Sequence, residues 1–141
     1  GDGKNVRDWL FVEDHAKAID MVQEQGRLFE TYNVGGHNEK QNIEIINIII
    51  DTLQEMLPAD DPRRALVSKD LITYVEDRKG HDRRYAIAPD KIKAEIGWYP
   101  ETDFATGIKK TIAWFFEHED WMKNVTSGDY QKYYDDMYAN K

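Results

Sequence analysis

The sequence predicts a small mixed α/β domain, and three observations support this prediction. Its 141 residues suit one domain, and a hydrophobic content of 40% is enough to build a core. Short apolar segments alternate loosely with longer segments in which apolar residues recur at helical spacing. The sequence contains no internal repeat and no low-complexity tract. This alternation favours a mixed α/β unit over a helical bundle.

The first strand and helix are predicted close to the start of the chain. Residues 6–12 form a short apolar strand candidate that carries Arg7. Asp14 is expected to cap the following helix, whose apolar positions recur at helical spacing until Gly26 stops it. Arg7 could be a salt-bridged structural residue or a binding residue, and the pattern alone leaves both alternatives open.

The second strand and helix follow the same order. Residues 31–34 form another strand candidate, and Gly35-Gly36 permits a tight turn after it. A largely buried helix is predicted from about residue 42 to residue 57, because its apolar stripe is wide. Asn42 is expected at the N-cap, where backbone N–H groups and the positive end of the helix dipole could bind an anion. A plain capping role for Asn42 is the alternative.

A charged loop is the most unusual feature of the sequence. Residues 59–69 are predicted to be a solvated connector, and residues 71–75 form a strand-like segment that leads into the loop. The loop holds three arginines and a histidine within seven positions, namely Arg78, His81, Arg83 and Arg84. Guanidinium groups bind phosphate in a bidentate manner, and this chain has a formal net charge of -8. The loop therefore indicates recognition of a specific anion.

Two further helices are predicted after the loop. The first should have Pro89 in its first turn and end before Gly97. The second should be capped by Asp103 and run from residue 104 to about residue 118. The remaining residues 121–138 include a tyrosine-rich tail, which we expect to pack against the rest of the protein.

Composition and motifs exclude several classes of function. The sequence has no cysteine, which fits a cytoplasmic location and rules out thiolate metal sites. A net charge of -8 and a pI near 5.0 argue against nucleic acid as a partner. The longest apolar run is far shorter than the ~20 residues of a membrane span, so we expect no membrane contact. The sequence lacks a dinucleotide fingerprint, a P-loop and a nucleophile elbow, and its four histidines are too scattered for a metal site. We therefore predict anion-binding groups, but no catalytic, cofactor-binding or metal-binding residue.

Five motifs occur in a characteristic order: GDGKNVRDWLFVEDHAKAI, ETYNVGGHNEKQN, YVEDRKGHDRRYAI, KIKAEIGWYPETDFATGIKKTIAW and SGDYQKYYDDMY. Together they resemble the C-terminal half of the dTDP-glucose 4,6-dehydratases, a family of extended short-chain dehydrogenase/reductases. RDW followed by V-x-D is shared by many nucleotide-sugar epimerases and dehydratases, whereas GGHNEKQN, DRKGHDRRYAI and SGDY are more specific to this dehydratase. The chain also starts at Gly1 without Met, in a predicted turn. We therefore expect residues 1–141 to be the C-terminal substrate-binding domain of a longer enzyme, without the Rossmann core.

The resemblance also implies a function for the intact enzyme, which would convert dTDP-glucose to dTDP-4-keto-6-deoxyglucose and water. NAD and the catalytic residues would belong to an N-terminal Rossmann domain that is absent from this sequence, so the isolated chain is expected to be inactive. Carried over by motif, Arg7 and Arg78 are the expected diphosphate clamps, and Asn42, His81 and Tyr138 complete the nucleotide-sugar pocket. The intact enzyme is expected to be a homodimer.

Two other hypotheses remain at this point. The chain could be the corresponding part of another NAD-dependent nucleotide-sugar epimerase, dehydratase or decarboxylase. It could instead be a non-catalytic nucleotide-binding or interaction module, in which the basic loop is only a solvated surface. Arg83 and Arg84 are expected to serve structure in either case. The connector at residues 59–70 is longer than the usual link in the family, and we expect no change in chemistry from it.

Overall fold

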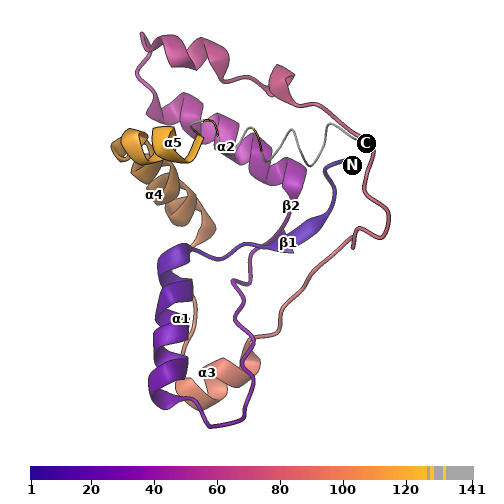
Figure 1. The fold of residues 1–141 in the computed structure, drawn as a ribbon, viewed down its shortest axis with the longest axis vertical. Helices are drawn as coiled ribbons and strands as arrows, with labels where there is room; N and C mark the ends of the chain where they lie inside the picture. Colours follow the sequence, from indigo (N-terminus) through magenta and orange to yellow (C-terminus); the bar gives the residue numbers. More distant parts are fainter. Residues whose placement is uncertain (127, 129–131, 133–141) are drawn as a thin grey trace. The chain divides into compact units, whose positions relative to one another are not determined.

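The computed structural model describes residues 1–126, 128 and 132, and it divides into two compact units, Gly1–Ile108 and Lys109–Lys141 (Figure 1). Within the described residues, short strands and longer helices alternate, which confirms the mixed α/β class. The elements in chain order are β1 (Val6–Asp8), α1 (Val12–Gln25), β2 (Glu39–Gln41), α2 (Asn42–Met56), the 3₁₀ helices η1 (Pro62–Leu66) and η2 (Lys69–Leu71), α3 (Asp90–Ile96), α4 (Phe104–Glu117) and α5 (Glu119–Thr126).

Strand β1 is hydrogen-bonded along both of its edges. On one edge it pairs antiparallel with β2, with Val6 opposite Gln41. On the other edge, the Val6 N–H donates to the Arg83 carbonyl at 2.8 Å, and the Tyr85 N–H donates to the Val6 carbonyl at 3.1 Å. These bonds form a parallel bridge between Val6 and Arg84. The charged loop is thus fixed to the first strand, 75 or more residues earlier in the chain.

The predicted start of α1 is wrong, whereas its predicted end is confirmed. The strand candidate at residues 6–12 is a strand only as far as Asp8, and the helix already begins at Val12. Asp14 is not the cap, because it lies inside the first turn and is buried. Its carboxylate instead accepts a hydrogen bond from the Thr102 N–H at 2.9 Å. The helix ends before Gly26, as the sequence predicts.

The two other strand predictions are wrong. Residues 31–34 and 71–75 are not strands, and neither has a partner strand within the described residues. A strand is stable only when its backbone groups pair with a neighbour, and side-chain composition cannot supply that neighbour. Tyr32 and Val34 instead pack against the core. Tyr74 and Val75 are exposed by 63% and 67%.

Helix α2 has the predicted range, but its start and its burial differ from the prediction. Gln41 is the N-cap in place of Asn42, and the Gln41 N–H donates to the Glu44 carboxylate at 2.6 Å. Only Ile45 and Thr52 are buried within the helix, and Ile46 is 40% exposed. The expectation of a largely buried helix is therefore wrong.

The connector after α2 is more ordered than a solvated link. The Arg64 guanidinium donates to the carbonyls of Gln54 and Leu57, the second at 2.9 Å. In return, the Gln54 side-chain amide donates to the carbonyls of Arg64 and Val67. These bonds satisfy carbonyls at the end of α2, which lack partners inside the helix. The connector is thus fixed to the helix that precedes it.

The core of the first unit lies between α1 and α3, and in Figure 1 the short α3 lies next to the lower end of α1. It consists of Ala18, Ile92, Ile96 and Trp98, each with at most 7% of its surface exposed. The Trp98 indole N–H donates to the Asp14 carbonyl at 3.1 Å. Buried indole N–H groups need such a partner, so this bond fixes the orientation of the ring.

Two predicted helix ends after the charged loop are confirmed. Gly97 ends α3 in the left-handed conformation, with a φ of 78°. Asp103 caps α4, because its carboxylate accepts a hydrogen bond from the Thr106 N–H at 3.0 Å. The prediction that Pro89 is the first residue of α3 is wrong, because Pro89 precedes the first helical residue of α3 and occupies the N-cap.

The second unit contains the end of α4, α5 and a cluster of aromatic rings. The Trp114 ring stacks on His118 with 4.2 Å between ring centroids and meets Trp121 edge-on at 5.2 Å. Within the part of the chain that the structure describes, no helix combines the length and apolar character that a membrane span needs. Most of the tyrosine-rich tail lies outside the described residues.

The first prediction concerns the core. Trp98→Ala should destabilise the protein by about 3–5 kcal/mol, because it opens a cavity between α1 and α3 and removes the bond to Asp14. Urea unfolding followed by circular dichroism measures this loss. Trp98→Phe keeps most of the buried volume and should cost clearly less. An unchanged unfolding midpoint for Trp98→Ala would show that the ring does not support this core.

The second prediction concerns the turn after α1. Phe29 has a φ of 66° and is fully exposed, in a turn closed by the Glu30 N–H and the Arg27 carbonyl at 3.3 Å. This conformation is unfavourable for any L-residue with a side chain, and it suits glycine. Phe29→Gly should therefore raise stability by up to about 1 kcal/mol and raise Tm by a few degrees. Leu28→Gly, at a position without positive φ, should lower Tm, and a drop for both variants would contradict the prediction.

Candidate functional site

The fold brings Arg7 and His81 together from segments 74 residues apart. One terminal nitrogen of Arg7, Nη2, lies 2.8 Å from His81 Nε2 and donates to the Asp82 carbonyl at 3.1 Å. The other, Nη1, donates to the Val6 carbonyl at 2.6 Å. The guanidinium carbon lies 4.5 Å from the centroid of the Tyr85 ring, in a cation–π arrangement. Arg7 is therefore held by hydrogen bonds and by an aromatic face, and no carboxylate within the described residues forms an ion pair with it.

The loop around His81 is anchored by two polar side chains. His81 Nδ1 lies 2.7 Å from the Asp77 carboxylate. The side chain of Asn5, a residue with only 3% of its surface exposed, donates to the Asp82 carbonyl at 3.2 Å. The hydrogen bond with His81 lowers the pKa of Asp77, which therefore stays a carboxylate at neutral pH. His81 is thus held between β1 and its own loop.

Tyr85 completes the wall beneath Arg7. Its hydroxyl donates a short hydrogen bond to the Asp82 carboxylate. This bond raises the pKa of Tyr85, so the ring stays neutral at physiological pH. A neutral ring keeps the face that attracts the Arg7 guanidinium.

Arg78 occupies the same turn as His81 but is arranged differently. Its carbonyl accepts a hydrogen bond from the His81 N–H at 3.3 Å, and Gly80 supplies the positive φ of 74° that the turn requires. The Arg78 side chain is exposed, and no described residue forms an ion pair or a hydrogen bond with its guanidinium. The structure thus presents one solvent-facing arginine beside the anchored pair of Arg7 and His81.

The two other arginines of the loop have structural partners, which confirms their expected role. Arg83 forms an ion pair with Asp2 at 2.9 Å. Arg84 forms an ion pair with Glu39 at 2.6 Å, across the paired strands. Both fasten the loop to the first part of the chain.

The two remaining predicted site residues are placed less directly. Asn42 is the first residue of α2, and its N–H donates to the Asn5 carbonyl at 3.0 Å. The next N–H, that of Ile43, donates to the Gly3 carbonyl at 2.8 Å. The prediction that these backbone groups are free for an anion is therefore wrong, whereas a ligand role for the Asn42 side chain stays a prediction. Tyr138 lies outside the described residues.

Sequence reasoning missed the residues that build the frame of the site. Asn5, Asp77 and Tyr85 hold the loop, as described above. Asp8 performs a similar task for the turn before β2, since its carboxylate accepts hydrogen bonds from the N–H groups of Gly36 at 2.8 Å and Asn38 at 2.9 Å. The four-residue spacing between Asp77 and His81 was the only sequence signal for their contact. In a loop, such a spacing does not predict that two side chains meet.

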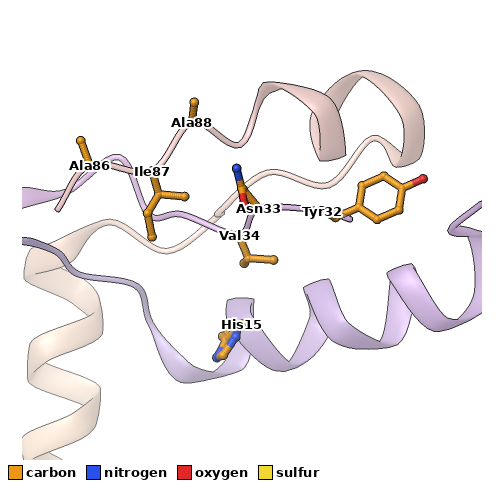
Figure 2. A pocket seen from close by; sticks show the side chains of 7 residues that line it. All are labelled: His15, Tyr32, Asn33, Val34, Ala86, Ile87 and Ala88. Carbon is orange, nitrogen blue, oxygen red and sulfur yellow. The ribbon is translucent and has the colours of Figure 1, made fainter. Parts of the chain in front are cut away.

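A separate pocket of about 470 Å³ lies between α1 and two extended segments (Figure 2). It contains none of the predicted site residues. Its lining consists of His15 on α1, one segment with Tyr32, Asn33 and Val34, and a second segment with Ala86, Ile87 and Ala88. The backbone groups of these two segments form no hydrogen bond with any described residue. The pocket is thus bordered by unpaired extended backbone.

Comparison with known proteins defines the class. The family model described as GDP-mannose 4,6 dehydratase matches residues 1–111, and the chain belongs to this family. The chain is 48% identical over all of its 141 residues to a dTDP-glucose 4,6-dehydratase of Shigella flexneri. That match spans 38% of the relative's length, at its C-terminal part. The resemblance stated from the motifs is confirmed.

Solved structures give the same picture. A dTDP-glucose 4,6-dehydratase from Bacillus anthracis, in complex with NAD, is 45% identical with a TM-score of 0.71, over 86% of this chain and 34% of that one. A UDP-glucose 4-epimerase from Thermotoga maritima, with UDP-glucose, is 26% identical with a TM-score of 0.64, over 83% of this chain and 33% of that one. The fold is therefore shared among dehydratases and epimerases, and the sequence is more similar to the dehydratase.

The third prediction concerns the turn that Asp8 organises. A Cβ atom at Gly36 would overlap the backbone carbonyl oxygen of Trp9, which is not free to move aside. Gly36→Ala should therefore destabilise the protein by about 1–3 kcal/mol, measured by thermal unfolding. Gly107→Ala is a matched control, since its Cβ would meet only the Phe11 side chain, at 3.3 Å. Equal melting temperatures for the two variants would contradict the prediction.

Proposed function

We propose that this chain is the C-terminal nucleotide-sugar-binding domain of a dTDP-glucose 4,6-dehydratase. In this proposal, Arg7, Arg78 and His81 bind the diphosphate of dTDP-glucose. The observation that carries it is the meeting of Arg7 and His81 at 2.8 Å, beside the solvent-facing Arg78. Three potentially cationic groups are gathered at one place in a chain with a net charge of -8. A diphosphate is the ligand that suits such a cluster.

The roles of the two arginines differ in this proposal. Arg7 is already oriented by the Tyr85 ring and by carbonyl acceptors, so it loses little freedom when it binds phosphate. Arg78 has an exposed side chain, and its ordering would accompany ligand binding. Asn42 and Tyr138 complete the pocket in the same proposal. The intact enzyme is proposed to be a cytoplasmic homodimer.

The choice of dTDP-glucose over other nucleotide sugars rests on similarity. Identity is 45–48% to the dTDP-glucose 4,6-dehydratases reported above and 26% to the epimerase. The described residues hold a two-stranded antiparallel sheet and no glycine-rich turn between a strand and a helix. They do not fit a dinucleotide such as NAD. We therefore assign NAD binding and the redox chemistry to a part of the enzyme outside this chain.

An N-terminal Rossmann domain is the proposed partner of this chain. The segments at residues 32–34 and 86–88, whose backbone groups form no hydrogen bond with a described residue, support this proposal, because exposed extended backbone is a template for strand pairing. Residues 31–34 have the composition of a strand, and Tyr32 and Val34 anchor one face in the core. A strand of the partner domain would satisfy the free backbone groups.

A chimera tests the proposed function directly. We join this chain to the N-terminal part of the Shigella flexneri relative and supply dTDP-glucose. The expected product is the nucleotide sugar that has lost one water, detected by mass spectrometry, whereas the chain alone should give none. UDP-glucose and GDP-mannose serve as competing substrates. A folded chimera that prefers either of them would replace the proposal with another dehydratase.

The fourth prediction concerns Arg78 in this chimera. Arg78→Ala should weaken nucleotide-sugar binding by about 1.5–3 kcal/mol, the range for a charged hydrogen bond, which raises KM about 10- to 150-fold. Steady-state kinetics measures the change. Arg83→Ala is the matched control, because Arg83 pairs with Asp2 and should leave KM nearly unchanged. Unchanged KM and kcat in Arg78→Ala would exclude the clamp.

A further inference from the structure

The hydrogen bonds of His81 determine which of its nitrogens carries the proton. Nδ1 lies 2.7 Å from the Asp77 carboxylate, which can only accept a hydrogen bond. The Asn5 amide nitrogen lies 3.4 Å from Nδ1, but it donates to the Asp82 carbonyl at 3.2 Å. Nδ1 therefore carries the proton and donates to Asp77.

The opposite nitrogen of the ring is consequently an acceptor. Nε2 lies 2.8 Å from Arg7 Nη2, and an arginine can only donate. Neutral His81, with its proton on Nδ1, satisfies both neighbours at once. A doubly protonated ring would direct an N–H group at the Arg7 guanidinium, so the contacts favour a ring without a proton on Nε2.

A diphosphate cannot accept a hydrogen bond from His81 Nε2 in this arrangement without a change. Phosphate oxygens accept hydrogen bonds, and Nε2 without a proton has nothing to donate. His81 could donate through Nε2 either by moving its proton from Nδ1 or by gaining a second one. Asp77 opposes the first route, because the move would leave the carboxylate facing a nitrogen lone pair.

We propose that Asp77 is a positioning residue that fixes the Nδ1-protonated form of His81, so that nucleotide-diphosphate binding draws Arg7 to the phosphates and adds a proton to Nε2. This inference rests on the proposed function. In the bound state, His81 donates from Nδ1 to Asp77 and from Nε2 to a phosphate oxygen. The lowered pKa of Asp77 supports it, since the carboxylate stays charged and stabilises the imidazolium.

The groups around His81 have opposing charges. They are Arg7 on β1, and Asp77, Arg78, Asp82 and Tyr85 on the loop. The hydroxyl of Tyr85 already occupies the Asp82 carboxylate. Asp77 is therefore the carboxylate that contacts the imidazole ring.

The sign of the pH effect follows from linkage. A proton that is taken up on binding makes binding tighter as pH falls. This contribution is lost as pH rises, and for one proton the affinity then falls by up to tenfold per pH unit. dTDP-glucose is a suitable probe, because each of its phosphates is bonded through one ester and the bridging anhydride and has no group that titrates near neutral pH.

The fifth prediction combines nitrogen NMR of the histidine rings with titration calorimetry on the chain. Free His81 should carry its proton on Nδ1 at neutral pH, and saturating dTDP-glucose should convert it to the imidazolium. Calorimetry in buffers of different ionisation heat should show uptake of up to one proton. His81→Gln should abolish this uptake.

Two carboxylate variants test the role of Asp77. Asp77→Ala removes the carboxylate that opposes transfer of the proton from Nδ1 to Nε2. The Nε2-protonated form can then bind the phosphates once Arg7 turns to them, without a second proton, so the pH dependence of affinity should flatten. Glu76→Ala removes the same charge next to it and should keep the full dependence. The inference is overturned if free wild-type His81 carries its proton on Nε2, if it stays neutral at saturation, or if Asp77→Ala keeps the full pH dependence.

Inorganic pyrophosphate separates this inference from the proposed function. Two results together would support the inference and reject the proposed function. They are that pyrophosphate converts His81 to the imidazolium and that the chimera does not dehydrate dTDP-glucose. The absence of any change at His81 with both pyrophosphate and dTDP-glucose would overturn the inference itself.

Discussion

The pairing of β1 along both edges is the constraint on which the rest of the site depends. A three-residue strand has few hydrogen bonds of its own, but Val6 is bonded to β2 on one edge and to the segment at residues 83–85 on the other. Since Arg7 follows Val6 directly, the strand places its guanidinium beside His81 and above Tyr85. The same bonds return a long loop to the start of the chain, where the ion pairs of Arg83 and Arg84 hold it.

Carboxylates perform much of the positioning in this acidic protein. Asp8 holds the turn before β2 through two backbone N–H groups, Asp14 holds the backbone at Thr102, and Asp77 holds the imidazole of His81. Each accepts hydrogen bonds from a segment distant in sequence or from a neighbouring turn. The negative net charge is therefore compatible with a cluster of cationic side chains, because these carboxylates accept hydrogen bonds that hold the surrounding backbone and side chains in place.

Local patterns predicted the helices well and the strands poorly. The ends of α1 and α3 at Gly26 and Gly97 are fixed by residues within a few positions, and their predictions are confirmed. A strand is defined by its partner, which local sequence does not reveal. Residues 31–34 and 71–75 have strand composition without a partner among the described residues, whereas β2 at residues 39–41 is polar and forms because β1 lies next to it.

The sequence by itself determined most of the helix ends and, through its motifs, the family, and it predicted an anionic ligand. It also indicated that Arg83 and Arg84 are structural. Only the tertiary structure decided that Arg7 meets His81, that the N–H groups of Asn42 and Ile43 are already occupied, and that the Asp77 carboxylate contacts Nδ1 of His81. The physical reason is distance: hydrogen bonds act over about 3 Å, whereas Arg7 and His81 are 74 residues apart in the chain.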